Sequence, residues 1–99
     1  MSARLSVAVQ TEDFDLRHEH QQLVQQDHGI GAVVAFIGMV RDLNLADDVV
    51  ALELEHYPGM TEKSLMNIVQ QAESRWSLQA ARVVHRVGKM YPGDQIVLV

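Results

Sequence analysis

The feature that most constrains the fold is the stretch Ala32–Val40, in which every residue is apolar or glycine. In an extended conformation both faces of this stretch are apolar, which is typical of a central strand covered on both sides of a sheet. The longest apolar run, Ile30–Val40, is about half the length that a membrane-spanning helix needs. The pattern therefore predicts a buried, central strand.

Further strands and two helices are expected around that stretch. Apolar and polar residues alternate, as in half-buried strands, in Arg4–Gln10, Val49–Tyr57, Ala80–Val87 and Gln95–Val99. Asp15–Asp27 is expected to form a helix with a thin apolar stripe, and Met60–Trp76 a helix with a broader apolar face. That face consists of Leu65, Ile68, Val69, Ala72 and Trp76.

The order of these elements predicts the fold class. It reads strand, helix, strand, strand, helix, strand, strand, and two strands follow one another without a helix between them. A purely alternating parallel sheet is therefore disfavoured. We predict an α+β fold in a hammerhead-like β-α-β-β-α-β-β order, with a mixed or antiparallel sheet and two helices packed on it. Residues 1–99 are expected to form a single domain, because the chain contains no linker or repeat.

Composition and charge narrow the classes of function. The absence of cysteine excludes a disulfide scaffold, a thiolate metal site and a cysteine nucleophile. The formal net charge of −5, without a basic stripe, argues against nucleic-acid binding. Met1–Leu5 lacks the long apolar core of a signal peptide. We expect a soluble cytoplasmic protein with no membrane partner.

No metal or cofactor is expected from the residue patterns. The glycines form neither of the common phosphate-binding loop motifs. The histidines have no recognised metal-binding spacing, and each is expected to have a structural or solvent role. They are His18, His20, His28, His56 and His85.

Arg41 is the most interesting single residue, because it stands where the apolar strand gives way to a polar segment. Strand ends that lead into loops commonly carry ligand-binding groups. A guanidinium at such a place could hold a phosphate or a carboxylate through two parallel hydrogen bonds. The alternative is an ion pair with Asp42 or a solvated strand end, and position alone does not decide between them.

A second candidate is the polar face formed by Glu53, Glu55 and Tyr57. Two neighbouring carboxyls could do acid–base chemistry if one pKa were raised. The alternative, a solvated or interface-facing strand face, is the ordinary reason for such alternation and is favoured. Lys63 and Lys89 are interpreted as surface residues, on a polar helix face and near a turn.

Four stretches are more informative as words than as periodic patterns. They are Gly31–Arg41, Leu54–Lys63 (LEHYPGMTEK), Val84–Gly88 and Tyr91–Val97. In this order they resemble four features of one protein family. These are a glycine-rich strand ending in Val-Arg, the most recognisable stretch of the family, the strand that follows it and the turn after that strand. That family is the large, catalytic subunit of molybdopterin synthase. The resemblance runs from Gly31 to the last residue, with a looser match before it.

The resemblance implies an enzyme of molybdenum cofactor biosynthesis, a sulfurtransferase that inserts two sulfurs into cyclic pyranopterin monophosphate and so forms molybdopterin. The sulfur would arrive as a thiocarboxylate on the C-terminal Gly-Gly of a ubiquitin-like small subunit, whose tail enters a pocket of the large subunit. Two large subunits would form a homodimer, and each would bind one small subunit in a heterotetramer. The substrate contacts carry over onto Met39, Val40 and Arg41, and Arg41 suits the phosphate of the substrate.

The chain also departs from the family pattern. Family members continue past Val99 with a Ser-Ala-His-Arg-type segment and a lysine-containing stretch, which would supply substrate and catalytic residues. The chain is therefore expected to be truncated and inactive alone, with no catalytic residue of its own. Met39 stands where many relatives have a lysine or another residue. The alternative is a non-catalytic, shortened relative that acts as a dimerisation or small-subunit-binding module. Association through exposed apolar surface is expected as well.

Overall fold

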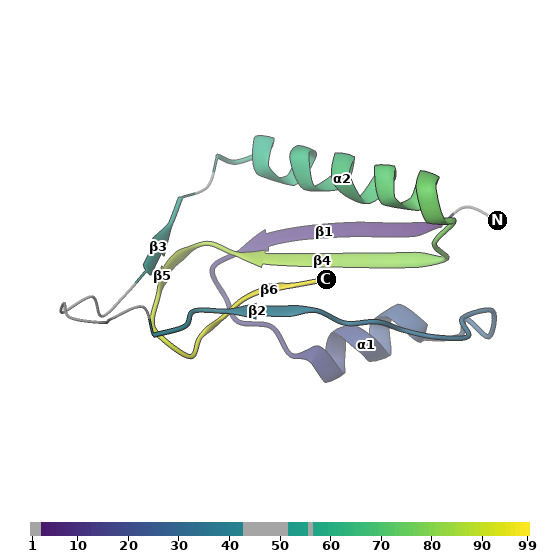
Figure 1. The fold of residues 1–99 in the computed structure, drawn as a ribbon, viewed down its shortest axis with the longest axis horizontal. Helices are drawn as coiled ribbons and strands as arrows, with labels where there is room; N and C mark the ends of the chain where they lie inside the picture. The colour runs from purple at the N-terminus through teal and green to yellow at the C-terminus, as the bar shows by residue number, and fades with distance from the viewer. Residues whose placement is uncertain (1–2, 43–51, 56) are drawn as a thin grey trace.

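The fold is α+β and is built on one four-stranded sheet (Figure 1). The computed structural model describes residues 3–42, 52–55 and 57–99. The sheet has the order β1-β4-β6-β2, formed by β1 (Arg4–Gln10), β4 (Ala80–Arg86), β6 (Gln95–Leu98) and β2 (Ile37–Met39). β1 runs parallel to β4, whereas β6 is antiparallel to both of its neighbours. The prediction of an α+β fold with a mixed sheet is confirmed.

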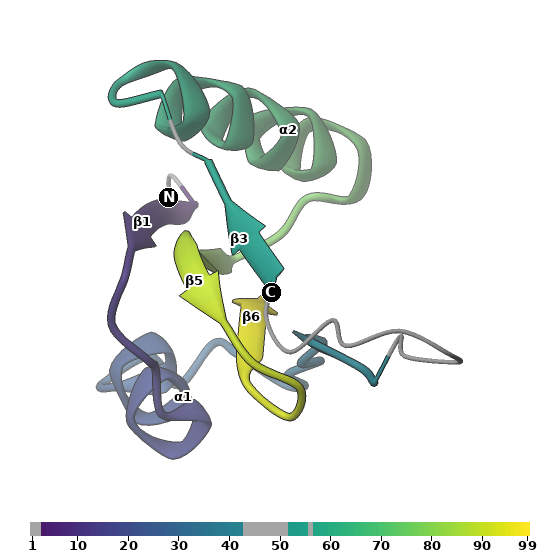
Figure 2. The ribbon, with the colours of Figure 1, turned by 90° about the vertical axis from the view of Figure 1, so that its left-hand side faces the viewer.

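A separate two-stranded sheet lies at one end of the main sheet (Figure 2). Its antiparallel strands are β3 (Leu52–Leu54) and β5 (Gly88–Met90). The predicted strand Val49–Tyr57 is confirmed over β3, while residues 49–51 and 56 lie outside the described part. The predicted order misses β5, because this strand has 3 residues and begins at Gly88, which has a φ of 90°. Such a short strand carries no readable alternation.

The helices α1 (Leu16–Val24) and α2 (Met60–Trp76) lie on opposite sides of the four-stranded sheet (Figures 1 and 2). α1 begins where the Asp15 side chain accepts a hydrogen bond from the Arg17 backbone N–H at 2.9 Å. α2 ends at Ser77, whose left-handed backbone lets its N–H donate to the Glu73 carbonyl. Both predicted helices are confirmed, and within the described residues neither is long and apolar enough to cross a bilayer.

The core lies between the middle strands and the link from β1 to α1. Phe14, Val84 and Leu98 form a buried cluster, and Ala8 and Ile37 pack against it. Burying one such large side chain stabilises a fold by about 1.5–3 kcal/mol. The core of this sheet therefore rests on a small number of residues from β4, β6 and the β1–α1 link.

The predicted apolar face of α2 is only partly buried. Val69 is buried, whereas Ile68 and Trp76 are mostly exposed. The guanidinium of Arg75 lies 5.3 Å from the centre of the Trp76 ring, which covers part of that ring with a charged neighbour. The helical spacing was read correctly, but it does not report how much of the stripe the sheet covers.

The prediction of a central, buried strand over Ala32–Val40 is wrong. Only β2 within it is a regular strand, and among the described residues β2 stands at the edge of the sheet and pairs only with β6. One further pair of hydrogen bonds, at 2.8 and 2.9 Å, joins Phe36 to Val99. Val34 is 89% exposed and Phe36 62% exposed. An edge strand has a sheet neighbour on one side only, so apolarity alone did not determine its place.

Candidate functional site

The end of β2 presents three consecutive residues in different environments. Val40 is buried, while Met39 and Arg41 are exposed. The Val40 backbone is fixed from both of its polar groups, because its N–H donates to the Asp94 carbonyl at 2.8 Å and its carbonyl accepts from the Gly93 N–H at 2.7 Å. Val40 thus anchors this short segment, and its two neighbours point towards solvent.

A β-bulge lies directly before these residues. Gly38 faces Val97 on β6, but Met39 already faces Gln95, so one residue of β6 is skipped. A Cβ atom at Gly38 would approach a methyl group of Val97 to 2.9 Å, and glycine avoids that clash. A bulge bends the strand and re-aims the side chains that follow it. Here the extra residue, Ile96, belongs to β6 and lies opposite the Gly38–Met39 step of β2.

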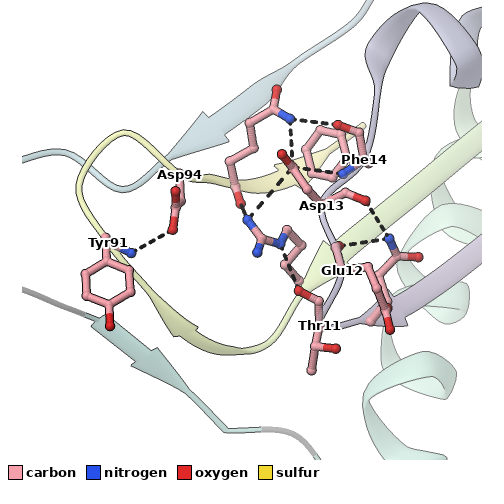
Figure 3. A network of polar contacts seen from close by, with 9 residues as sticks. Thr11, Glu12, Asp13, Phe14, Tyr91 and Asp94 are labelled. Atoms are coloured by element: carbon pink, nitrogen blue, oxygen red, sulfur yellow. Dashed lines mark hydrogen bonds and ion pairs between the residues drawn. The ribbon is translucent and has the colours of Figure 1, made fainter.

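The turn Tyr91–Asp94 forms the other half of this arrangement. The Asp94 carboxylate accepts a hydrogen bond from the Tyr91 backbone N–H at 2.8 Å, and the Asp94 N–H donates to the Tyr91 carbonyl at 2.9 Å (Figure 3). Gly93 adopts a φ of 94°, which side-chain-bearing residues rarely accept. Hydrogen bonds within the turn hold it closed, independently of its contacts with Val40. The turn was predicted correctly from its sequence.

A polar network lies behind that turn and joins three segments of the chain (Figure 3). The Gln95 side-chain amide donates to the Asp13 carboxylate at 2.9 Å and to the Phe14 carbonyl at 2.8 Å. The Arg86 guanidinium donates to the Gln95 carbonyl at 2.9 Å and to the Thr11 carbonyl at 3.2 Å. We call Asp13, Arg86 and Gln95 the polar brace. Sequence reasoning missed it, since its members are up to 82 positions apart.

The electrostatics of the brace favour an ionised Asp13. The hydrogen bond from the Gln95 amide, followed by the one from the Phe14 backbone N–H, lowers the pKa of Asp13 below its usual value, and the nearby charge of Arg86 acts in the same direction. Arg86 lies 3.8 Å from that carboxylate and has a side chain that is only 13% exposed. One charged group and two neutral donors therefore converge on one carboxylate.

Arg41 directly follows Val40 at the end of β2. Its side chain is exposed, and no salt bridge among the described residues includes it. A guanidinium presents its donors in a fixed planar fork, which matches the oxygens of a phosphate or a carboxylate. The arrangement can bind an anion at a backbone position that the Tyr91–Asp94 turn fixes.

The other predicted candidates do not form a second site. Glu53, Glu55 and Tyr57 are exposed, and Glu53 faces Lys89 across the β3–β5 pair. Opposite charges at such positions stabilise a strand pair modestly, so the solvated-face interpretation is favoured. Lys63 is exposed on α2, and the Lys89 amine lies 5.8 Å from the centre of the Tyr91 ring.

The histidines are dispersed over the described part of the chain. His18, His20 and His28 are exposed, and a ring nitrogen of His85 lies 2.8 Å from the Arg86 carbonyl. His56 lies outside the described residues. Within them, no group of three potential metal-binding side chains occurs.

An apolar hollow lies at the end of the sheet opposite the Tyr91–Asp94 turn. It encloses about 410 Å³ between α1, residues 32–36 and the start of β4. At its rim Glu19 accepts a hydrogen bond from Arg82 at 3.0 Å. We call this cavity the apolar slot; Leu16, Leu23, Val33, Phe36 and Leu98 are among its lining residues. No sequence motif points to it, because it depends on where β2 and β6 pair.

Comparison with known proteins gives one consistent result. The model of the family described as MoaE protein matches residues 9–99. A molybdopterin synthase catalytic subunit from Vibrio cholerae is 59% identical over 93 residues, which cover 94% of this chain and 61% of the relative. One from Haemophilus influenzae is 55% identical over 95 residues, covering 96% and 63%.

Solved structures agree with the sequence relatives. A molybdopterin cofactor biosynthesis protein E from Burkholderia multivorans superimposes with a TM-score of 0.85 at 53% identity, covering 96% of this chain and 61% of that one. The crystal structure of molybdopterin synthase from Staphylococcus aureus gives a TM-score of 0.76 at 27% identity, covering 92% and 65%. The chain thus spans about three-fifths of the length of the relatives and structures it matches.

Proposed function

The chain belongs to the MoaE family, and on that premise we propose that it acts in molybdopterin synthase, in molybdenum cofactor biosynthesis. The proposed reaction transfers sulfur from a thiocarboxylated, ubiquitin-like small subunit to cyclic pyranopterin monophosphate. The names of its relatives, molybdopterin synthase catalytic subunits, support this reaction. The proposed partners are that small subunit and a second large subunit, in a heterotetramer. The proposed compartment is the cytoplasm.

We place the substrate contacts at Met39, Val40 and Arg41. The observation that carries this assignment is the fixed backbone of Val40, which holds Arg41 at a defined place beside the Tyr91–Asp94 turn. The guanidinium of Arg41 would bind the substrate phosphate through two charge-assisted hydrogen bonds. Met39, 52% exposed, would offer an apolar contact beside it.

No residue of the chain is assigned a catalytic role. The two lysines, Lys63 and Lys89, are exposed, and Lys89 packs against Tyr91. Both amines are exposed and lie outside the contacts assigned to the substrate. The assigned residues therefore bind and orient the substrate.

A second function is supported by the exposed apolar surface at residues 33–36. Val34 and Phe36 are exposed in the segment that leads into the edge strand β2, where another polypeptide can pair. Such a surface favours a dimerisation or small-subunit-binding module that does not turn over substrate. This module would bind the small subunit and leave the pterin phosphate unbound.

The experiment that tests the assignment compares two arginine variants by calorimetric titration. Arg41→Ala should raise the Kd for cyclic pyranopterin monophosphate about ten- to a hundredfold, because it removes a charged hydrogen-bond donor. The affinity for the small subunit should change much less. Arg75→Ala is the matched control, since Arg75 is also an exposed arginine but lies on α2 against Trp76. Equal loss of both affinities in Arg41→Ala, or no loss, would contradict the assignment.

A further inference from the structure

We propose that Gln95 is a positioning residue for the substrate site at Met39–Arg41, and that Asp13 and Arg86 hold it in place. The proposal rests on the proposed function, since it assumes that Arg41 binds the substrate phosphate. It goes beyond that function because Gln95 contacts no substrate in this account. Its role is to fix the strand that presents the arginine.

The first step is that Gln95 is fixed by both of its ends. Its side-chain amide donates to Asp13 at 2.9 Å and to the Phe14 carbonyl at 2.8 Å, so both N–H groups have acceptors. Its backbone carbonyl accepts from Arg86 at 2.9 Å. Three directional contacts from two other segments define the place of one residue. That residue is the one that faces Met39 across the β-bulge.

The second step leads from Gln95 to Arg41 through the backbone. Gln95 directly follows Asp94, whose carbonyl accepts the Val40 N–H at 2.8 Å. Gly93, on the other side of Asp94, donates its N–H to the Val40 carbonyl at 2.7 Å. A shift of Gln95 therefore moves the Asp94 carbonyl and disturbs the pair that holds Val40. Arg41 is one peptide bond further, and binding sites tolerate displacements of only about 0.5 Å.

Arg86 links the brace to the rest of the sheet. Its guanidinium also donates to the Thr11 carbonyl at 3.2 Å, next to the point where the Val87 N–H donates to the Gln10 carbonyl at 2.9 Å. The exits of β1 and β4 are thereby tied to the first residue of β6. The brace thus connects Gln95 to β1 and β4.

The same fold contains a matched network that does not reach β2. At the other end of β1, Arg4 donates to the Leu23 carbonyl at 2.8 Å and to the Asp27 carboxylate at 2.9 Å. This network ties the end of α1 to β1, as the brace ties the β1–α1 link to β6. It has no contact with Met39–Arg41 or with the Tyr91–Asp94 turn. Arg4 therefore provides a control for a purely structural loss.

The test compares Gln95→Met with Arg4→Met in the whole 99-residue chain. Methionine has a similar length to glutamine but cannot donate a hydrogen bond. Titration of cyclic pyranopterin monophosphate should give a Kd about tenfold higher for Gln95→Met than for wild type. Arg4→Met should bind within about twofold of wild type. This should hold even if its thermal midpoint falls by as much as that of Gln95→Met. An equal effect of both variants, or an unchanged Kd in Gln95→Met, would overturn the proposal.

A second readout does not depend on the ligand. Nitrogen-15 relaxation of the Val40 and Arg41 amides in the ligand-free protein should show increased motion in Gln95→Met and unchanged motion in Arg4→Met. Unchanged Val40 and Arg41 amides in Gln95→Met would sink the positioning role. If Gln95→Met fails to fold, Asp13→Ala removes one acceptor of the brace at an exposed position and is judged by the same criteria.

The two proposals fail in distinguishable ways. Arg41→Ala is titrated in the same series. If wild type and Arg41→Ala bind the pterin phosphate equally, the proposed function fails at this site, whereas the amide relaxation still decides whether Gln95 positions the strand. If Arg41→Ala loses affinity and Gln95→Met does not, the proposed function holds and the positioning role is wrong.

Discussion

The two ends of the four-stranded sheet differ in how they are held together. At one end, the Tyr91–Asp94 turn, the polar brace and the end of β2 are joined by directional hydrogen bonds. At the other end, residues of α1, residues 32–36 and the start of β4 line the apolar slot. At this end Arg4 forms an ion pair with Asp27, and Arg82 forms one with Glu19. One end is specified by polar geometry and the other by apolar surface.

The difference matters for the kind of ligand that each end can take. Hydrogen bonds depend steeply on distance and angle, so a site built from them fixes the orientation of what it holds. The hydrophobic effect has no direction and depends on the area removed from water. An anion is therefore expected at the polar end, and apolar polypeptide or a second protein surface is the natural neighbour of the slot end.

The largest predicted difference between the two ends is in their apolar residues. Met90 is fully buried beside the turn, so Met90→Ala should lower the free energy of unfolding by about 2–5 kcal/mol. Val34, at the slot, is 89% exposed, and Val34→Ala should change that free energy by less than about 0.5 kcal/mol. Urea unfolding of both variants measures this. Similar losses would contradict the burial that the structure assigns.

The next prediction compares an arginine from each end. Arg86→Met leaves the Thr11 and Gln95 carbonyls without their donor, so we expect a loss of about 1–3 kcal/mol in the free energy of unfolding. Arg82→Met removes one ion pair with Glu19 whose side chains are 29% and 17% exposed, and we expect about 0.5–1 kcal/mol. Urea unfolding again gives both values. A larger loss for Arg82→Met would reverse the comparison.

Much of the architecture was readable in the sequence, and the exceptions have physical reasons. Alternation located β1 and β4, and helical spacing located α2. The stretch Ala32–Val40 was misplaced because its apolar faces report affinity for other apolar groups and do not say which strand will lie beside it. β5 was missed because it is too short to show a period.

The candidate site was predictable in part. Arg41 could be singled out because it ends an apolar run and continues a recognisable motif. The contacts that place it could not, because Gln95 and Asp13 become neighbours only when β6 passes the β1–α1 link. No pattern in the sequence encodes that crossing. The only nearby feature that the sequence predicted is the Tyr91–Asp94 turn, and its contact with Val40 was not predicted.

Acid should weaken both ends, and the carboxyl at each can be examined separately. The pKa of Asp13 is lowered first by its hydrogen bond from Gln95, and that of Asp27 first by its hydrogen bond from Arg4. A carboxyl with a lowered folded-state pKa stabilises the fold above its unfolded value, about 4, and this contribution is lost as pH falls through the folded value. Stability should therefore decline below about pH 4.

The matching variants sharpen that expectation. Asp13→Asn and Asp27→Asn should each make the decline below about pH 4 shallower than in wild type, because each removes one titrating group. The two effects should add, since the sites share no partner. Thermal midpoints recorded from pH 3 to pH 7 provide the measurement (about the range in which carboxyls titrate). An unchanged slope in both variants would assign the acid sensitivity to other groups.

The smallest effect on stability is predicted at the exposed slot edge, where the change should be in association. Val34→Lys should alter the free energy of unfolding by less than about 0.5 kcal/mol. It should nevertheless reduce self-association, because a charge in the exposed segment that leads into the edge strand β2 opposes pairing of that edge with another strand. Sedimentation velocity over a concentration series tests this. A monomeric wild type at high concentration would remove the reason to expect association there.

The central claim is that the polar end carries the substrate site, and amide shift mapping by NMR tests it most directly. Titration of cyclic pyranopterin monophosphate into the nitrogen-15-labelled chain should perturb the amides of Met39, Val40 and Arg41 and those of the Tyr91–Asp94 turn. The amides of α1 and of residues 33–35 should keep their positions. Perturbations gathered around the apolar slot, with Arg41 and the turn unaffected, would contradict the account.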